Sequence, residues 1–174
     1  MIAVATVVEG EGEVSAVPAL IRNLAYTRGF YDVATPRPIL LPRSNFLIPA
    51  DFARAVELAT RQVGEGGGVI ALLDADDDCA LELVKRISAG YQGGRRFALV
   101  AAVREYESIF LPRSPGFDPE AVRDAKGAIR ETTGLPYRVT AHQTSLSATL
   151  DLDHARQCRW FRKFEHELLA ILRG

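Results

Sequence analysis

Three segments of the chain are almost continuously apolar, and acidic residues follow each of them closely. These segments are 2–8 (IAVATVV), 69–74 (VIALLD) and 97–103 (FALVAAV). Parallel strands covered by helices on both faces have this composition, because neither face of such a sheet meets water. The pattern therefore predicts three buried strands, and a shorter apolar run at about 38–41 (PILL) predicts a fourth.

Between these strands, apolar residues recur three or four positions apart, which is typical of amphipathic helices. The recurring residues are Val14, Val17, Ile21 and Leu24 in one stripe and Phe52, Val56, Ala59 and Val63 in another. The stripes predict a helix that begins near residue 11 and a helix over about 50–63. A further helix is expected after residue 74, with Asp77 and Asp78 capping its N-terminus. Strands separated by helices form βαβ units, so the central sheet should be parallel.

The pattern changes after Pro112 and becomes mostly helical. We expect a helix at about 118–131, then a break at Gly134 and Pro136, and finally one long helix over 151–172. The apolar stripe of that last helix should pack against the sheet or a partner. Its members are Leu152, Ala155, Phe161, Phe164, Leu168 and Ile171. The chain therefore reads as one α/β domain over 1–174, with a core of about 1–112 and a helical extension of about 113–174.

Composition agrees with a single soluble globular domain. The 174 residues are 48% apolar and 25% charged, which excludes collagen-like, disordered and disulfide-scaffold classes. Two cysteines, Cys79 and Cys158, without CxxC spacing, indicate a reducing compartment and imply no zinc. The N-terminal apolar run stops at Val8, too short for a signal peptide or a membrane span, so we expect a cytoplasmic protein with no membrane partner.

Carboxylates gather where three of the predicted strands end. Ligands of an open parallel sheet bind beyond the carboxyl ends of its strands, so these groups should share one crevice. The acids are Glu9, Glu11 and Glu13, then Asp74, Asp76, Asp77 and Asp78, and finally Glu105 and Glu107. Such a concentration of negative charge repels itself, and Mg²⁺ or Mn²⁺, which take oxygen ligands, are its usual neutralisers.

Each acidic cluster taken alone has a simpler interpretation. Acids favour helix N-termini, which would explain the EGEGE segment of residues 9–13. The DxD pair Asp74 and Asp76 can point into one site from alternate positions, but many such pairs bind no metal. No common capping explanation covers all three clusters, because Glu105 and Glu107 follow AAVR. The combination therefore favours a metal site.

Several motifs together resemble a known family. VVEGEGE, LLDADDD and AAVREYESIFL, then Lys126 and finally DLDHARQCRWFRKF, are similar to the TOPRIM-like domain-of-unknown-function family 4276. The resemblance covers nearly the whole chain and implies a TOPRIM-like fold. TOPRIM domains occur in primases, topoisomerases, recombination proteins and the overcoming-lysogenization-defect (OLD) nucleases, where a glutamate and a DxD pair hold a divalent metal.

The resemblance assigns roles to particular residues of this chain. It implies that Glu9, Asp74 and Asp76 hold Mg²⁺ or Mn²⁺ and are catalytic. The OLD-type nucleases also carry a second glutamate and a later lysine, which would be Glu13 as a further ligand and Lys126 as a catalytic residue. Lys126 would neutralise charge on the transition-state phosphate, although a lone helical lysine is also an ordinary surface residue. Glu105 and Glu107 match the EYE segment of the family, and both are candidate metal ligands.

Nucleic acid would have to bind through local basic groups. Lys and Arg number 21 against 22 Asp and Glu, for a net charge of −1, so binding should be weak and salt-sensitive. Arg104, Arg159 and Lys163 are the candidate substrate contacts, with Arg95, Arg96, Arg156 and Arg162 in support. The alternative for the C-terminal helix is a solvated basic face. His142 is either an acid–base or substrate contact or a structural histidine.

Two functions from different classes fit the sequence. The first is a metal-dependent phosphoryl-transfer enzyme, a nuclease that cleaves phosphodiester bonds in DNA or RNA and acts in phage defence with a partner ATPase. The second is a non-catalytic TOPRIM-like regulatory subunit of an ATPase, since the chain lacks the ATPase that OLD-type proteins carry. The metal hypothesis requires the strands that end at Glu9 and Asp74 to be neighbours.

Overall fold

A computed structural model describes residues 1–91, 96–112 and 115–174, so Arg95 lies outside the described residues. Its sheet has five strands, and every pairing between them is parallel. The strands are β1 (Ile2–Val8), β2 (Val33–Ala34), β3 (Ile39–Leu40), β4 (Gly68–Asp74) and β5 (Phe97–Ala102). Their order is β2-β1-β4-β5, with β3 also paired to β1. The predicted α/β fold with a mainly parallel sheet is confirmed.

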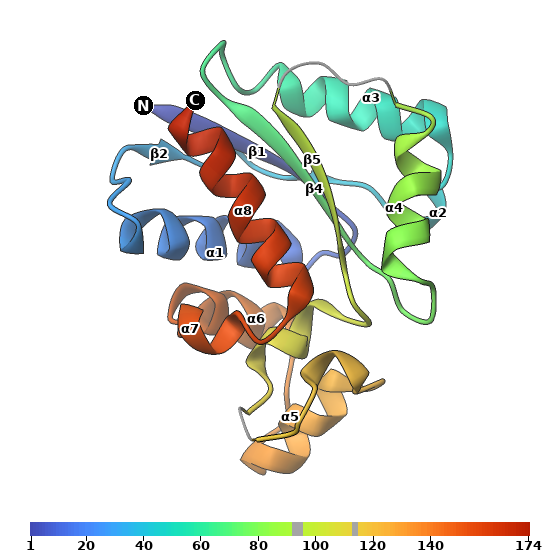
Figure 1. The fold of residues 1–174 in the computed structure, drawn as a ribbon, viewed down its shortest axis with the longest axis vertical. Helices are drawn as coiled ribbons and strands as arrows, with labels where there is room; N and C mark the ends of the chain where they lie inside the picture. The colour runs from blue at the N-terminus through green and yellow to red at the C-terminus, as the bar shows by residue number, and fades with distance from the viewer. Residues whose placement is uncertain (92–95, 113–114) are drawn as a thin grey trace.

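Helices follow the strands and continue into the C-terminal third of the chain (Figure 1). In the first part they are α1 (Glu13–Thr27), α2 (Arg43–Phe46), α3 (Pro49–Thr60) and α4 (Ala80–Ser88). After β5 come two 3₁₀ turns, η1 (Tyr106–Phe110) and η2 (Pro119–Ala121). The last helices are α5 (Ala125–Thr133), α6 (Val139–Ala148), α7 (Leu152–Ala155) and α8 (Arg159–Arg173).

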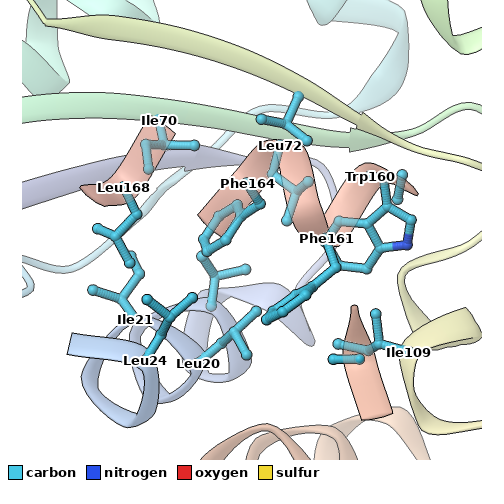
Figure 2. Close-up of a cluster of buried hydrophobic side chains, with 14 of the residues drawn as sticks. Leu20, Ile21, Leu24, Ile70, Leu72, Ile109, Trp160, Phe161, Phe164 and Leu168 are labelled. Atoms are coloured by element: carbon cyan, nitrogen blue, oxygen red, sulfur yellow. The ribbon is translucent and has the colours of Figure 1, made fainter. Parts of the chain in front are cut away.

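The sheet separates two hydrophobic cores. Successive residues of a strand point to opposite faces, so Ile70 and Leu72 enter one core while Ala71 and Leu73 enter the other. Helices α1 and α8 cover the first face, and α3 and α4 cover the second (Figure 1). Figure 2 shows the first core, where aromatic residues of α8 pack between β4 and α1. Both faces are therefore covered, as the continuous apolar runs predict.

The predicted strands agree closely with the observed ones. β1 and β4 match their predicted segments within one residue, and β5 ends one residue earlier than predicted. The run at 38–41 forms only the two-residue strand β3, and β2 has no counterpart in the prediction. Two-residue strands carry too little apolar pattern to be recognised. β1 and β4 are direct neighbours, with Val8 opposite Leu72, as the metal hypothesis requires.

The prediction of one helix over 118–131 is wrong. The Asp118 carboxylate accepts from the backbone N of Glu120 and closes the short turn η2, after which Val122 is extended. Asp124 then caps α5 by accepting from the backbone N of Gly127. Two local capping aspartates therefore divide the segment into a turn and a helix. Gly134, at φ 67°, ends α5 where the break was expected.

The prediction of one continuous helix over 151–172 is also wrong. Cys158 is extended and separates α7 from α8. The buried Glu120 carboxylate accepts from the backbone N of Trp160 and from Nε of Arg159, which satisfies the first turn of α8. A residue from outside the helix thus fixes where α8 begins, and no periodicity within 151–172 encodes that boundary.

Asp77 and Asp78 do not cap α4. The N-cap is Cys79, without a side-chain hydrogen bond, and the helix begins at Ala80. Both aspartates instead pair with arginines, Asp78 with Arg43 at 2.9 Å and Asp77 with Arg104. Cys79 is exposed, whereas Cys158 is buried, and burial raises the pKa of its thiol to about 12. Within the described ranges, no helix combines the length and apolar character that crossing a membrane needs.

Candidate functional site

The ends of β1 and β4 bring two of the predicted acids together. Glu9 directly follows β1 and Asp74 is the last residue of β4. The backbone N of Asp74 donates to Oε2 of Glu9 at 3.1 Å, although 65 positions separate the two residues. Both carboxylates therefore lie at the carboxyl edge of the sheet, where parallel α/β folds bind ligands.

A cavity of about 370 Å³ opens at this edge, and we call it the acidic pocket. The β1–α1 turn forms one wall, and residues from β4, η1, α5 and the first turn of α6 form the others. Its lining residues are Glu9, Gly10, Glu11, Gly12, Glu13, Asp74, Glu107, Lys126, Val139 and Thr140. Six residues that the sequence singled out thus share one cavity, namely Glu9, Glu11, Glu13, Asp74, Glu107 and Lys126.

The glycines of the β1–α1 turn shape this wall. The backbone N of Gly10 donates to Oε2 of Glu13 at 2.6 Å and holds that carboxylate against the turn. A Cβ on Gly12 would lie 2.2 Å from Cγ1 of Val139 and 2.0 Å from Oε1 of Gln143. Gly12 therefore allows α6 to pack directly on the turn and close one side of the acidic pocket.

Gln143 joins two carboxylates behind the pocket. Its side chain is fully buried, and its Nε2 donates to Oε1 of Glu13 at 3.1 Å and to Oε1 of Glu107 at 3.4 Å. The hydroxyl of Tyr137 also donates to Oε1 of Glu107, at 3.2 Å. These neutral donors reduce the repulsion between the buried Glu107 and the half-buried Glu13 without adding a charge.

Glu105 and Glu107 have different surroundings. Glu107 is buried and lines the acidic pocket, whereas Glu105 lines a separate depression and accepts from the backbone N of Ala125 at the start of α5. Nζ of Lys126 lies 2.5 Å from Oε1 of Glu105 and 3.1 Å from Oε2 of Glu107. Lys126 therefore links the two acids, and Glu107 is the one that faces the pocket.

The electrostatics of the acidic pocket favour added positive charge. Burial, together with the nearby Glu13 and Glu107 carboxylates, raises the pKa of Asp74 well above its usual range. Burial also raises the pKa of Glu9 and of Glu107. Lys126 is affected in two ways, because burial lowers its pKa but the Glu107 and Glu105 carboxylates outweigh burial and raise it. The cluster thus holds protons, or another cation, more tightly than isolated carboxylates would.

Asp76 does not line the acidic pocket. Its backbone is left-handed, with φ 50°, and its backbone N donates to the carbonyl oxygen of Arg104, which turns the chain away from Asp74. Its side chain is exposed, and Oδ2 lies 3.4 Å from Nη1 of Arg43. The same nitrogen lies 3.7 Å from Oε2 of Glu9 and donates to the carbonyl oxygen of Asp74 at 2.5 Å. Of the three expected metal ligands, Glu9 and Asp74 line the acidic pocket and Asp76 does not, and Arg43 contacts all three residues.

The predicted substrate-binding arginines and lysine lie away from the pocket lining. Arg104 pairs with Asp77, Arg159 with the buried Glu120 at 2.6 Å, and Lys163 with Glu167. Arg104 and Arg159 line a different depression of about 620 Å³ beside α4. Among the supporting residues, Arg156 pairs with Glu165 and Asp153, Arg162 donates to the carbonyl oxygen of Arg156, and Arg96 donates to that of Gly66. These groups already have intramolecular partners.

The acidic pocket presents carboxylate oxygens, which are the type of donor that Mg²⁺ takes. Among the described residues, no group of three or more His, Cys, Asp or Glu side chains is arranged to hold a metal ion by itself. Mg²⁺, however, keeps several waters and is often bound through one or two carboxylates and a substrate phosphate. Within the same residues, Oε1 of Glu9 and Oδ2 of Asp74 accept no hydrogen bond, while the other oxygen of each carboxylate is held by a backbone N–H. These two oxygens fit such an ion.

Sequence reasoning missed the groups that position these acids. The backbone N of Tyr106 donates to Oδ1 of Asp74, and the Tyr106 hydroxyl is hydrogen-bonded to Oγ of Ser147 at 2.8 Å. Arg43 and Gln143 were also not recognised. The position of Arg43 could have been predicted from the sequence, because it closely follows β3 and the carboxyl ends of all parallel strands meet at one edge. Gln143 has none, since a glutamine in a polar helical segment looks like a surface residue.

Comparisons with protein-family models, with curated proteins and with solved structures find no match to this chain.

Proposed function

We propose that the protein is a divalent-metal-dependent phosphodiesterase, a nuclease, whose reaction takes place in the acidic pocket. The observation that carries the proposal is the convergence of Glu9, Glu13, Asp74, Glu107 and Lys126 on one cavity at the carboxyl edge of the parallel sheet. A cavity lined by five acidic residues, Glu11 included, and one lysine suits a ligand that combines a cation with an anion. A metal ion and a phosphodiester are such a pair, and the resemblance to TOPRIM-like families favours the same chemistry.

Glu9 and Asp74 would hold the ion through their free oxygens. The bonds from the backbone N of Asp74 to Glu9 and from the backbone N of Tyr106 to Asp74 fix both carboxylates before the ion arrives. Mg²⁺ or Mn²⁺ supplies a bound water of lowered pKa and stabilises charge on the phosphate. Asp76 lies outside this ligand set, because its carboxylate is exposed beside Arg43.

The remaining residues of the acidic pocket would set its charge and shape. Lys126 offsets the negative charge of Glu105 and Glu107, and its side chain lines the same cavity as the two ligand carboxylates. A substrate phosphate that approaches the ion thereby meets an ammonium group as well as carboxylates. Glu13 is held by Gly10 and Gln143, so it contributes charge at a fixed position.

Incubation with labelled DNA and RNA in Mn²⁺ or Mg²⁺ tests the proposal. The wild type should cleave at least one substrate, and a chelator should stop the cleavage. Asp74→Asn and Glu9→Gln should each reduce the rate by more than about 100-fold, since even outer partners of metal ligands contribute about 10- to 100-fold. Asp77→Asn is the matched control, because it removes a carboxylate of the same DADDD segment outside the acidic pocket.

Equal cleavage by wild type and Asp74→Asn would remove the acidic pocket from the reaction. Absence of cleavage by the wild type, in both metals and also with a co-purified ATPase partner, would exclude the nuclease. The non-catalytic regulatory subunit of an ATPase is the reading that would then replace it. In that case Asp74→Asn should support the same cellular phenotype as the wild type.

A further inference from the structure

A second, apolar cavity lies beside the acidic pocket. It has a volume of about 180 Å³ and lies between α5 and α6, and we call it the apolar slot. The side chains that shape it are those of Ile129, Leu135, Pro136, Tyr137, His142 and Leu146. None of them lines the acidic pocket, so the two cavities are separate. Leu135 is 69% exposed and Leu146 is 36% exposed, which leaves apolar surface uncovered at the slot.

Tyr137 connects the apolar slot to the acidic pocket. Its ring lines the slot, while its hydroxyl donates at 3.2 Å to Oε1 of Glu107, which lines the acidic pocket. Burial and the Glu107 carboxylate raise the pKa of the Tyr137 hydroxyl, so it stays a neutral donor. One side chain therefore belongs to the wall of the apolar slot and contacts a residue of the acidic pocket.

The walls of the apolar slot suit a flat aromatic ring. The rings of Tyr137 and His142 lie with centroids 5.9 Å apart and planes inclined by 37°. The backbone N of Arg138 donates to Nδ1 of His142 at 2.9 Å, which fixes the imidazole and makes Nε2 its proton-bearing nitrogen. Two fixed rings, aliphatic neighbours and one ring donor form a stacking surface with a polar group.

Two exposed arginines are sequence neighbours of residues that line the apolar slot. Arg130 and Arg138 are exposed and adjoin the lining residues Ile129 and Tyr137 in the chain. In the part of the chain that the structure describes, neither guanidinium group has a carboxylate partner. They differ in this respect from Arg104, Arg156 and Arg159, which are paired. Exposed guanidinium groups without a carboxylate partner remain available to contact phosphates of a nucleotide chain.

We propose that the apolar slot binds one unpaired nucleobase of a single-stranded nucleic acid whose adjoining phosphodiester lies in the acidic pocket. The choice of ligand rests on the proposed nuclease function, and the slot adds the class of substrate. A base within a duplex is stacked and paired, so it enters such a cavity only from a single strand or an extruded position. The protein therefore prefers single-stranded to double-stranded substrates.

Binding of two fluorescein-labelled hexamers, measured by fluorescence anisotropy with a chelator and low salt, tests the slot without any cleavage. One probe is single-stranded hexathymidylate, and the other has the same backbone with abasic sites. Stacking of one base contributes about a 5- to 150-fold tighter Kd, so the wild type should prefer the thymidylate probe by a factor in that range. Comparing the two probes cancels the repulsion between the acidic pocket and the backbone.

Leu146→Asp should abolish the preference by placing a charge in the slot. Leu135→Asp should do the same from an exposed loop position outside the helices, where a charge is tolerated by the fold. Leu81→Asp, at an exposed leucine of α4, is the matched control and should keep the preference. Equal binding of the two probes by the wild type, or an unchanged preference in both slot variants, would overturn the proposal.

The same samples separate this inference from the proposed function. If the wild type cleaves in a metal-dependent way but binds both probes equally, base binding in the apolar slot is overturned and the proposed nuclease function stands. A base preference that depends on Leu146 and Leu135 would support base binding in the apolar slot, and it would still exclude the nuclease if no cleavage occurred in Mn²⁺, in Mg²⁺ or with the co-purified ATPase partner.

Discussion

Asp74 ends a buried strand, and its surroundings favour the protonated carboxyl group. Burial is the main cause, and Glu13, Glu107 and Glu9 add like charge, whereas Lys126 acts in the opposite direction. The folded protein therefore binds a proton at Asp74 more tightly than the unfolded chain, whose pKa is near 3.8. The stabilisation that this proton gives is complete below the pKa of the unfolded chain. It is lost as the pH rises through the higher pKa of the folded protein.

Asp74→Asn should stabilise the metal-free protein at neutral pH. Asparagine mimics the protonated carboxyl group, and its side-chain oxygen can still accept from the backbone N of Tyr106. We expect a higher free energy of unfolding than that of the wild type at pH 7, and no difference near pH 3, where the wild-type carboxyl group is protonated in both states. Urea unfolding in a chelator across this pH range measures the difference. A gain that does not depend on pH, or an equal gain in Asp77→Asn, would contradict the explanation.

Single residues also show what sequence could and could not predict of the site. The four acids Glu9, Glu13, Asp74 and Glu107 were recognisable, because acids at the ends of parallel strands share an edge. Lys126 was a prediction of the resemblance alone, and nothing in the local pattern around it indicates a place in the cavity. The placement of Asp76 was not predictable, since it depends on a left-handed backbone at a non-glycine residue. The sequence Asp-Ala-Asp does not show whether its two carboxylates point into one cavity or are directed apart by the backbone.

Helix α6 is an element that the sequence pattern did not predict. Its buried residues include Gln143 and Ser147, four positions apart, so the face that packs on the protein is polar. Tyr106 and Glu13 supply the hydrogen-bond partners of that face from distant segments. A hydrophobic stripe is the signal by which a helix is recognised, and α6 has none. The strands β1, β4 and β5, which are apolar on both faces, were predictable for the opposite reason.

Gly12→Ala should displace α6 from the β1–α1 turn. The backbone of Gly12 is helical, at φ −63° and ψ −41°, so alanine is not strained there, and only the contacts with Val139 and Gln143 oppose it. We expect a loss of about 1–3 kcal/mol in the free energy of unfolding, which is typical of overpacking. Gly64→Ala is the control, because no atom lies within 4 Å of its added Cβ. Equal stability of the two variants would show that α6 does not rest on the turn.

At the scale of the whole molecule, parallel topology makes the site possible. β1 and β4 are separated by two short strands and three helices in the chain, yet they lie side by side in the sheet. Helices α5 to α7 lie together below the sheet in Figure 1, and α5 and α6 complete the acidic pocket. Sequence predicted the parallel sheet, but the order of its strands depends on packing among distant segments.

A divalent ion that binds only the folded chain should raise its melting temperature. Binding at about 100 times the Kd adds about 2.7 kcal/mol, and each kcal/mol corresponds to about 2–4 °C for a domain of this size. We expect Mn²⁺ to raise the Tm of the wild type by about 5–10 °C and to leave Glu9→Gln and Asp74→Asn unchanged. Scanning calorimetry with and without a chelator measures the shift. The same shift in all three proteins would place the ion elsewhere.

One cysteine is exposed and the other is buried, so a spin label can be attached to the wild-type chain at a single site. Thiol reagents react with the thiolate, so exposed Cys79 should be modified rapidly, while Cys158 is protected by burial and by its raised pKa. Cys79 precedes α4, five positions after Asp74. A nitroxide can be attached there without any engineered substitution. If Asp74 binds Mn²⁺, the paramagnetic ion should broaden the spectrum of the nitroxide, and the broadening reports the distance between label and ion.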